Sequence, residues 1–384
     1  MILHRAIAFL LFFLAGCSTV AVPASTPIAQ PPIQSTSASS PTTAIVPASP
    51  QIPTATPEPI LQLSTVLTDF LGLRAPTLAW SDDSQFLAFA GRQRTVRVWS
   101  VANQSLADAK IYTYVSSLNW SNDGIVNAAG YDSTSWRLNP NGTINQGYFG
   151  HANAVFAVAP NPTQDLIVSV SSDKRLRWWN AAGDEITVIN NGASLWNAVW
   201  NPQGTLLATS DGDYHVKLWS TDGELQATLN GHSDDPTLLA WNGDGTILAS
   251  AGLDGSVRLW SASGGALQTW RSSVPIVGLA WHPSNSTLTW LDAEGNMRQE
   301  VIEFSSVQSA KTAFTQPLAW NPAGTILAVG RTTGIVELRD LRGITIQYLE
   351  GHTAEVMSVA WSNDGRWLAT GSGDGTVRIW RMQK

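Results

Sequence analysis

The sequence predicts an all-β protein, an eight-bladed ring of four-stranded antiparallel sheets, from three observations. A short apolar segment that ends in Trp recurs every 39 to 41 residues. Residues that favour tight turns follow each of these segments. Further short segments then alternate apolar and polar residues, as strands with one face in a core do. This period is the one expected of a propeller blade.

The recurring Trp fixes the number of units. Eight equivalent positions exist, and one of them holds Pro160 instead of Trp. The other seven are Trp80, Trp120, Trp200, Trp241, Trp281, Trp320 and Trp361. Each unit is long enough for four short strands and their turns, so eight units predict eight blades.

Within a unit the expected elements follow in a fixed order. The last unit has a turn at 362–365, a second strand at 367–370 and a third strand at 377–380. Asn, Asp and Gly in the turn supply the backbone conformations that hairpins need. A fourth strand is expected at positions such as 225–229, directly before the next unit.

Three units resemble the WD-repeat family closely. Each opens with Gly-His, and the family's structural tetrad of His, Ser or Thr, Asp and Trp can then be read at spacings of 18, 4 and 6 residues. The resemblance implies three buried hydrogen-bonded tetrads, whose members are His151, Ser169, Asp173 and Trp179; His232, Ser250, Asp254 and Trp260; and His352, Thr370, Asp374 and Trp380.

The remaining units depart from this pattern. A fourth unit keeps Thr209, Asp213 and Trp219 but has Asn191 in place of His, and the others lack most of the tetrad. Seven blades are commoner in the family, and that alternative is set against the eight complete units. A tetrad inside each blade has no oxyanion site beside it, so Ser-His-Asp catalysis is not expected there.

The segment 60–67 precedes the first unit and has the composition of a strand. The sequence after Trp380 is too short for the outer strand of the last blade. We therefore expect residues 60–67 to supply that strand and to close the ring, which removes exposed sheet edges. The propeller is expected to span residues 60–384.

The N-terminus reads as a targeting signal. Arg5 is followed by a short apolar run that is well below the roughly 20 residues of a membrane span. The sequence 14–17, Leu-Ala-Gly-Cys, resembles a bacterial lipobox, which implies a signal peptide at 1–16 and an acyl anchor on Cys17. Because Cys17 is the only cysteine, we expect no intramolecular disulfide and no cysteine-based metal site.

Residues 17–59 are expected to form a lipidated tether. Ser, Thr, Ala and Pro dominate this stretch, and such a composition cannot bury enough apolar surface to fold. Without residues 1–16 the chain has 21 basic and 29 acidic residues, a net charge of −8. The acidic balance and the lack of a basic cluster exclude a typical nucleic-acid-binding protein.

A binding surface is expected at the rim where the loops before the first strands meet the loops between the second and third strands. The repeat register places aromatic and acidic side chains there, and aromatic residues are frequent anchors for partners. The candidate residues are Tyr114, Tyr131, Phe156, Trp196, Asp235, Phe314 and Glu355. The alternative is that Phe156 and Trp196 only line the central channel.

The sequence favours a membrane-anchored, extracytoplasmic scaffold that is a monomer without catalytic activity. Its partner is expected to be a protein or peptide, with carbohydrate left open, and neither a metal nor another cofactor is expected. The alternative is a propeller enzyme whose site in the central funnel uses Asp235, Glu355, Arg74 or Arg92. Such an enzyme would need these groups to converge in one pocket.

Overall fold

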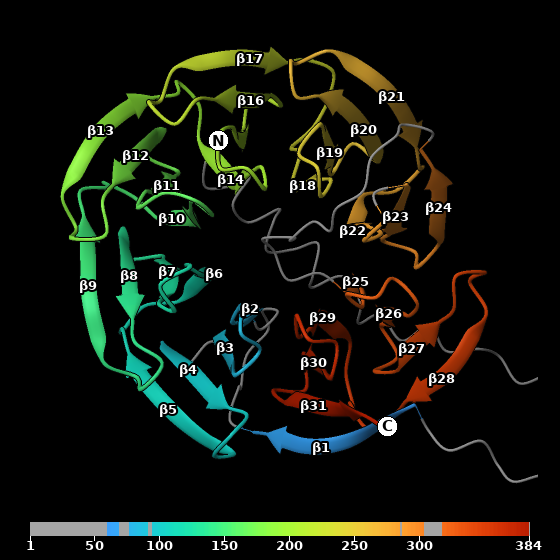
Figure 1. Ribbon diagram of the computed structural model, residues 1–384. Helices are drawn as coiled ribbons and strands as arrows, with labels where there is room; N and C mark the ends of the chain where they lie inside the picture. Colours follow the sequence, from blue (N-terminus) through green and yellow to red (C-terminus); the bar gives the residue numbers. More distant parts are fainter. Residues whose placement is uncertain (1–59, 69–76, 91–93, 285, 303–316, 384) are drawn as a thin grey trace, which may run out of the picture. The chain divides into compact units, whose positions relative to one another are not determined.

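The computed structural model describes residues 60–68, 77–90, 94–284, 286–302 and 317–383. Their strands form eight antiparallel sheets that follow one another around a ring, with the first strand of each sheet innermost (Figure 1). Seven sheets have four strands, and in the sixth the described residues supply three. The prediction of eight blades is confirmed, and the seven-bladed alternative is wrong.

The first four blades take their strands in simple chain order. The strands are β2 (Thr77–Trp80), β3 (Phe86–Ala90), β4 (Thr95–Ser100) and β5 (Ser105–Lys110); β6 (Val115–Trp120), β7 (Val126–Gly130), β8 (Thr134–Leu138) and β9 (Ile144–Phe149); β10 (Val155–Pro160), β11 (Ile167–Ser171), β12 (Arg175–Trp179) and β13 (Glu185–Asn190); and β14 (Leu195–Trp200), β15 (Leu207–Asp211), β16 (Val216–Trp219) and β17 (Leu225–Leu229).

The last four blades continue this order, except that the eighth takes its outer strand from the start of the propeller. The strands are β18 (Leu238–Trp241), β19 (Ile247–Ala251), β20 (Ser256–Ser261) and β21 (Ala266–Arg271); β22 (Ile276–Trp281), β23 (Thr287–Asp292) and β24 (Met297–Val301); β25 (Leu318–Trp320), β26 (Leu327–Gly330), β27 (Val336–Arg339) and β28 (Thr345–Leu349); and β29 (Val356–Trp361), β30 (Trp367–Ser372), β31 (Val377–Met382) and β1 (Leu61–Leu67).

The core lies between the blades. Inner strands are buried on both faces because each blade packs between two neighbours, and all five residues of β15 and of β19 are buried. One such core joins Val168 and Leu176 of the third blade to Leu195 and Trp219 of the fourth. Outer strands such as β13 alternate exposed and partly buried residues because only one face has a neighbour.

The strand β1 closes the ring, as predicted. It pairs with β31 in antiparallel register from Leu61 opposite Met382 to Leu67 opposite Val377. Leu61 enters the core between the seventh and eighth blades, and Leu67 enters the core between the eighth and first blades. Gln347 of β28 also holds the Leu61 backbone, with distances of 2.9 Å from Leu61 N to Gln347 Oε1 and 2.7 Å from Gln347 Nε2 to Leu61 O.

In five blades the recurring Trp at the end of the first strand donates a hydrogen bond to a backbone carbonyl of the blade before it. The Trp120 indole donates to the Ala79 carbonyl across 2.8 Å, and Trp80 donates to Ala360 across 3.0 Å, where the ring closes. The indoles of Trp200, Trp241 and Trp281 make the same bond to Ala159, Val199 and Ala240. The Trp that marks the repeat in the sequence therefore also forms a hydrogen bond between neighbouring blades.

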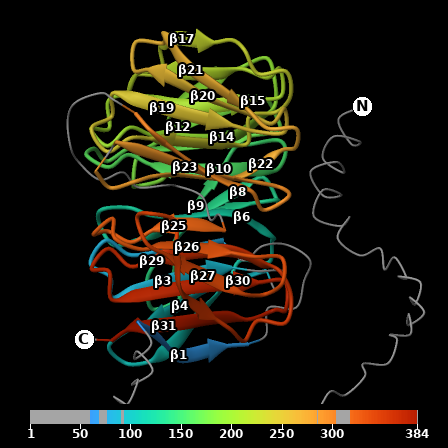
Figure 2. The same cartoon turned by 90° about the vertical axis from the view of Figure 1, so that its right-hand side faces the viewer.

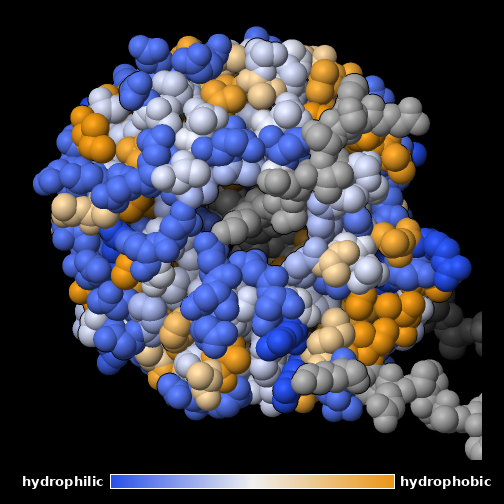
Figure 3. All heavy atoms as spheres, in the orientation of Figure 1, coloured by the Kyte–Doolittle hydropathy of each residue, from blue (hydrophilic) through white to orange (hydrophobic). Residues whose placement is uncertain are grey.

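Seen from the side, the fourth and eighth blades lie at opposite ends of the ring (Figure 2). Polar side chains cover much of the face in Figure 3, and apolar ones gather over β27 and β28. Among the residues that the structure describes, no helix is long and apolar enough to span a membrane.

Candidate functional site

The three tetrads form directed chains of hydrogen bonds inside the blades. In the third blade, Trp179 Nε1 donates to Ser169 Oγ across 2.8 Å, and Ser169 Oγ lies 2.8 Å from His151 Nε2. His151 Nδ1 lies 2.9 Å from Asp173 Oδ2. The tetrads of His232 and His352 repeat these contacts at 2.8 to 3.0 Å.

The tetrad carboxylates are held in the charged form. Burial is the largest influence on Asp173 and acts to raise its pKa, but the bond from His151 and the backbone N–H groups of Ala152 and Arg175 outweigh it. The pKa of Asp173 falls to about 2. The same combination lowers the pKa values of Asp254 and Asp374, whereas burial lowers the pKa of His352.

In each tetrad a hydroxyl, a His and an Asp are hydrogen-bonded in the same order as in a Ser-His-Asp catalytic triad. Unlike the hydroxyl of such a triad, however, the tetrad hydroxyl is not accessible to a substrate. Ser169, Ser250 and Thr370 are each 0% exposed, and each hydroxyl oxygen also accepts the bond from a Trp indole. A substrate carbonyl could not approach such an oxygen without opening the blade. Through bonds such as that from the Ala152 N–H to Asp173 Oδ2, the tetrads hold the loop before the first strand in place.

The fourth unit uses a different carboxylate from the one that the repeat register suggested. Trp219 Nε1 donates to Thr209 Oγ1 across 2.8 Å as expected. Asn191 Nδ2, however, donates to Asp211 Oδ2 across 3.0 Å, and Lys217 pairs with the same oxygen at 3.0 Å. Because the amide of Asn differs in shape and reach from a His ring, Asp211 at the end of β15 takes the acceptor role instead of Asp213.

The other blades replace the tetrad hydroxyl with an apolar side chain. In the third blade the tetrad hydroxyl belongs to Ser169, which stands on the second strand and pairs with Arg177 of the third strand. The residues at the same position of the second strand in the first, second, sixth and seventh blades are Phe89, Ala128, Trp290 and Val329. All four are buried. Packing therefore takes the place of the polar network there.

The rim residues occupy equivalent places, as the repeat register implies. Tyr114, Ala154, Ser194, Pro275 and Glu355 each stand directly before the first strand of a blade, and Asp235 stands three residues before β18. The carbonyl of each accepts a backbone bond from the turn between the second and third strands; for Tyr114 the donor is Tyr131, at 3.0 Å. Phe314, Arg74 and Arg92 lie outside the described residues.

A β-bulge at the start of the first strand, which the sequence did not reveal, shapes this rim. In five blades the pairing with the second strand skips one residue. Such a residue is unpaired in the ladder, and a bulge redirects its side chain. The skipped residues are Ser116, Phe156, Trp196, Val277 and Met357.

Three aromatic side chains from consecutive blades contact one another at this rim. Tyr131 and Phe156 have ring centroids 5.6 Å apart at 80°, and Phe156 and Trp196 lie 5.1 Å apart at 68°. Both are the edge-to-face geometry that aromatic pairs prefer. Tyr114 is 41% exposed, and the Arg94 guanidinium lies 5.3 Å from its ring centroid. We call Tyr114, Tyr131, Phe156 and Trp196 the aromatic rim.

The two acidic rim residues lie apart from the aromatic rim. Asp235 is buried and precedes the first strand of the fifth blade, and Glu355 is partly buried and precedes the first strand of the eighth. Burial raises the pKa of Glu355. Two blades lie between the blades of the two carboxylates, so the structure does not bring them together.

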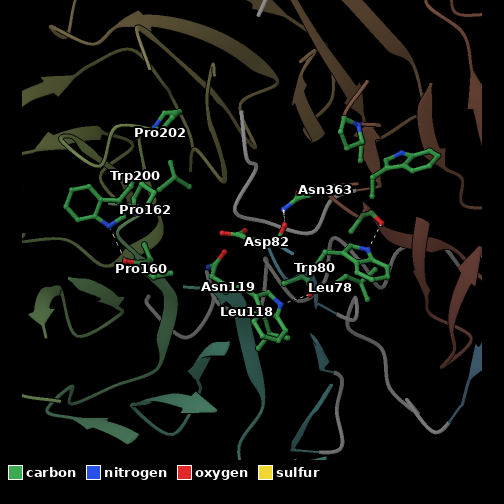
Figure 4. A pocket seen from close by; sticks show the side chains of 18 of the residues that line it. Leu78, Trp80, Asp82, Leu118, Asn119, Pro160, Pro162, Trp200, Pro202 and Asn363 are labelled. Atoms are coloured by element: carbon green, nitrogen blue, oxygen red, sulfur yellow. Dashed lines mark hydrogen bonds between the residues drawn. The ribbon is translucent and has the colours of Figure 1, made fainter. Parts of the chain in front are cut away.

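The opposite end of the channel holds a hollow of about 560 Å³. It is lined by the ends of the first strands and the turns after them, including Trp80, Trp200, Pro160, Pro162 and Pro202 (Figure 4). Turn side chains are bonded across blades there: Asn363 Nδ2 donates to the Asp82 carbonyl across 3.2 Å. Among the described residues, no group of three His, Cys, Asp or Glu could hold a metal ion.

Comparisons with known proteins show what the repeats are similar to. The family model described as WD domain, G-beta repeat matches five segments, residues 76–100, 142–180, 185–220, 223–261 and 343–381. These segments cover the three inner strands of the first, third, fourth and fifth blades, and those of the eighth up to residue 381. All three complete tetrads lie within matched segments.

Several curated proteins are similar over part of the chain. The F-box-like/WD repeat-containing protein TBL1X of Mus musculus is 33% identical over 22% of this chain and 19% of its own length. Telomerase protein component 1 of Rattus norvegicus is 30% identical over 61% of this chain and 9% of its own. WD repeat-containing protein SL1-17 of Schistosoma mansoni is 26% identical over 58% and 64%. The chain thus spans less than two thirds of each of these relatives.

Proposed function

We propose that this chain, a β-propeller whose repeats match the WD40 family model in five segments, is a non-catalytic scaffold that holds a protein or peptide partner on the aromatic rim. The contact of Tyr131, Phe156 and Trp196 across three blades carries this proposal. Large, rigid aromatic side chains lose little conformational entropy on binding and supply most of the binding free energy at many interfaces. Three blades hold them in place before a partner arrives.

The arrangement of titratable groups supports a scaffold over an enzyme. The three hydroxyl–His–Asp chains are enclosed in the blades. Asp235 and Glu355, which the enzyme alternative would use, stand on the fifth and eighth blades. General acid–base catalysis needs two such groups within hydrogen-bond reach of one substrate. Nothing in the described structure favours that alternative.

The cellular setting is part of the same proposal. The lipobox-like sequence 14–17 supports removal of residues 1–16 and an acyl anchor on Cys17. The Pro-rich stretch 18–59 would hold the propeller outside the cytoplasm and away from the bilayer. The acidic net charge supports a partner other than nucleic acid.

The test is affinity capture from envelope extracts with the full chain and two double variants. Phe156→Ala with Trp196→Ala should weaken capture of the main partner by about tenfold or more, since an anchor aromatic contributes about 2 kcal/mol. Phe149→Ala with Tyr348→Ala is the matched control, because both are exposed aromatic residues away from the rim.

Melting temperatures must be measured for both variants. Equal capture by the two double variants, with both folded, would show that the aromatic rim does not bind the partner. Loss of capture on changing Asp235 and Glu355 instead would indicate an electrostatic interaction on the other half of the rim.

A further inference from the structure

The turn between the second and third strands differs between the two halves of the ring. In every blade the residue after the position of the tetrad Asp has a positive φ, between 56° and 86°. In the fifth to eighth blades this residue is Gly, at Gly255, Gly295, Gly334 and Gly375. In the first to fourth blades it carries a side chain. We call these four the left-handed rim residues: Arg94, Ser133, Lys174 and Tyr214.

A side chain at this position costs backbone free energy. In the left-handed region Cβ crowds the carbonyl oxygen, whereas Gly adopts this conformation freely. The turn itself needs no side chain, because its closing bond is the same in both halves, 3.2 Å from Lys174 N to Ser171 O and 3.2 Å from Gly375 N to Ser372 O. Backbone strain of this kind gathers at functional sites, where the side chain is needed.

A fifth left-handed residue stands on the same half of the rim. Tyr112, in the loop before β6, has a φ of 57° and is 76% exposed. The Arg94 carbonyl accepts from the Tyr112 N–H across 3.1 Å, so a backbone bond joins the two strained residues. The described part of the chain has seven non-Gly residues with positive φ, and five of them therefore lie on the half of the rim that carries the aromatic rim.

The two halves also differ in the space above this position. A Cβ at Gly255 would lie 2.5 Å from the Ser272 carbonyl oxygen, and a Cβ at Gly334 would lie 2.4 Å from that of His352. In these two blades the loop into the next blade leaves no room for a side chain. Arg94 and Lys174, by contrast, are exposed. The first half of the ring thus presents side chains to solvent at a position that is closed in part of the second half.

The charges of the rim differ in the same way. Outside the tetrads, the described rim loops of the first four blades carry two cations and two carboxylates, Arg94 and Lys174, and Asp132 and Asp213. Neither cation forms an ion pair with a carboxylate of the described residues. The rim loops of the last four blades carry five carboxylates and one cation, Asp234, Asp235, Glu294, Glu350 and Glu355, and Arg331, which is paired with Glu337 at 2.8 Å. An acidic partner would therefore be repelled by the second half and would meet free cations on the first.

We propose that Arg94 and Lys174 select an acidic peptide segment by binding its carboxylates, while its apolar side chains lie on the aromatic rim. This inference rests on the proposed function and specifies the partner. The first to fourth blades follow one another around half of the ring, so an extended segment can contact them in order (Figure 1). Charge-assisted hydrogen bonds to the cations supply selectivity, and the aromatic side chains supply most of the affinity.

The first measurement selects peptides with the full chain as bait, from a randomised library displayed on phage. The tightest binder is then synthesised in two forms, with its Asp and Glu residues intact or changed to Asn and Gln. We expect peptides rich in acidic and apolar residues, and about tenfold weaker binding of the amide form in fluorescence polarisation. Selection of peptides without acidic residues, or of none at all, would overturn the proposal.

The second measurement uses variants of the chain with the selected acidic peptide. Arg94→Gly with Lys174→Gly should weaken binding by about tenfold and remove most of its dependence on salt. Arg342→Gly is the matched control, because Arg342 is 79% exposed, lies in the turn between β27 and β28 and does not have a positive φ. Peptide binding that is equal in the double variant and in wild type would overturn the proposal.

Melting temperatures separate a binding role from a structural one. Lys174→Gly relieves the left-handed strain, which outweighs the added freedom of the unfolded chain, so its melting temperature should equal or exceed that of wild type. Arg342→Gly relieves no such strain and should melt at a lower temperature. A lower melting temperature of Lys174→Gly would mean that the side chain is kept for the fold, and would overturn the proposal.

Phe156→Ala with Trp196→Ala tests the proposed function with the same peptide. If this variant loses peptide binding and the Arg94 and Lys174 double variant does not, the selection of acidic partners by the cations is overturned and the aromatic rim stands. If the aromatic variant keeps peptide binding and the cationic one loses it, the proposed function fails and the cations stand as the acid-binding residues. The two failures are thus distinguishable.

Discussion

At the scale of single residues, the tetrads show how a buried carboxylate becomes a stabilising group. Asp173 Oδ2 accepts from His151 Nδ1 and from the Ala152 N–H, and Oδ1 accepts from the Arg175 N–H. Each donor would be left without this acceptor if the carboxylate were removed. A buried donor without a partner costs about 1 to 3 kcal/mol.

The first prediction is that Asp173→Asn lowers the free energy of unfolding at pH 7 by about 2 kcal/mol. The folded-state pKa of about 2 lies below the unfolded value, so the carboxylate stabilises the fold above about pH 4 and loses this effect as the pH falls toward 2. The difference from wild type should therefore shrink on acidification. Denaturant titrations from pH 7 to pH 3 check this, with the exposed Asp222→Asn as control; a difference that is independent of pH would contradict it.

The second prediction concerns Glu355, whose pKa burial raises. The folded protein then binds this proton more tightly than the unfolded chain does. The free energy of unfolding therefore falls as the pH rises through the pKa that Glu355 has in the folded protein. Glu355→Gln should melt at a higher temperature than wild type near pH 8 and at the same temperature near pH 4. A lower melting temperature of the Gln variant near pH 8 would mean that an unrecognised partner stabilises the carboxylate.

At the scale of elements, the two ends of β1 pack into two different cores. Leu61 fills the core between the seventh and eighth blades, and Leu67 fills the core on the other side of the eighth. Between them, the register shifts near Leu63 and Thr65, and side chains such as Leu63 are exposed. One strand therefore connects the first and last parts of the propeller through packing as well as through backbone bonds.

The third prediction uses two leucines of this strand. Leu61→Ala should cost about 2 to 4 kcal/mol of unfolding free energy, because Leu61 is 1% exposed and a cavity would remain. Leu63→Ala should change it by less than about 0.5 kcal/mol, since Leu63 is 43% exposed. Equal losses, measured by denaturant unfolding, would count against closure of the ring through the core contacts of β1.

At the scale of the whole molecule, the ring separates two surfaces. The aromatic rim lies at one end of the channel on the second to fourth blades, and the hollow lies at the other end. The chain enters the ring through β1, the outer strand of the eighth blade. The proposed anchor upstream of β1 is thus compatible with a partner on the aromatic rim.

The fourth prediction concerns the proposed lipid anchor on Cys17. Cys17→Ser should abolish incorporation of radiolabelled palmitate, because the thiol is the proposed acceptor of the lipid, and should release the protein from the membrane fraction or leave it unprocessed. Wild-type protein labelled in parallel is the control. Palmitate labelling that persists in the Cys17→Ser chain would exclude the lipoprotein interpretation.

The sequence alone determined the parts of this fold that are local and repeated. The spacing of Trp80 to Trp361 gave the eight blades, and the strand composition of 60–67 gave the closure, because a four-stranded blade has a fixed chain length and its strands alternate side chains with period 2. The spacings of the His, hydroxyl, Asp and Trp side chains likewise predicted which of them meet at His151, His232 and His352.

Only the tertiary structure decided where neighbours about 40 residues apart touch. The bulges at Phe156 and Trp196 depend on how two strands pair, and their contact depends on how two blades pack, so neither has a signature in a single segment. The exchange of Asp213 for Asp211 follows from the reach of Asn191 and Lys217 across the blade.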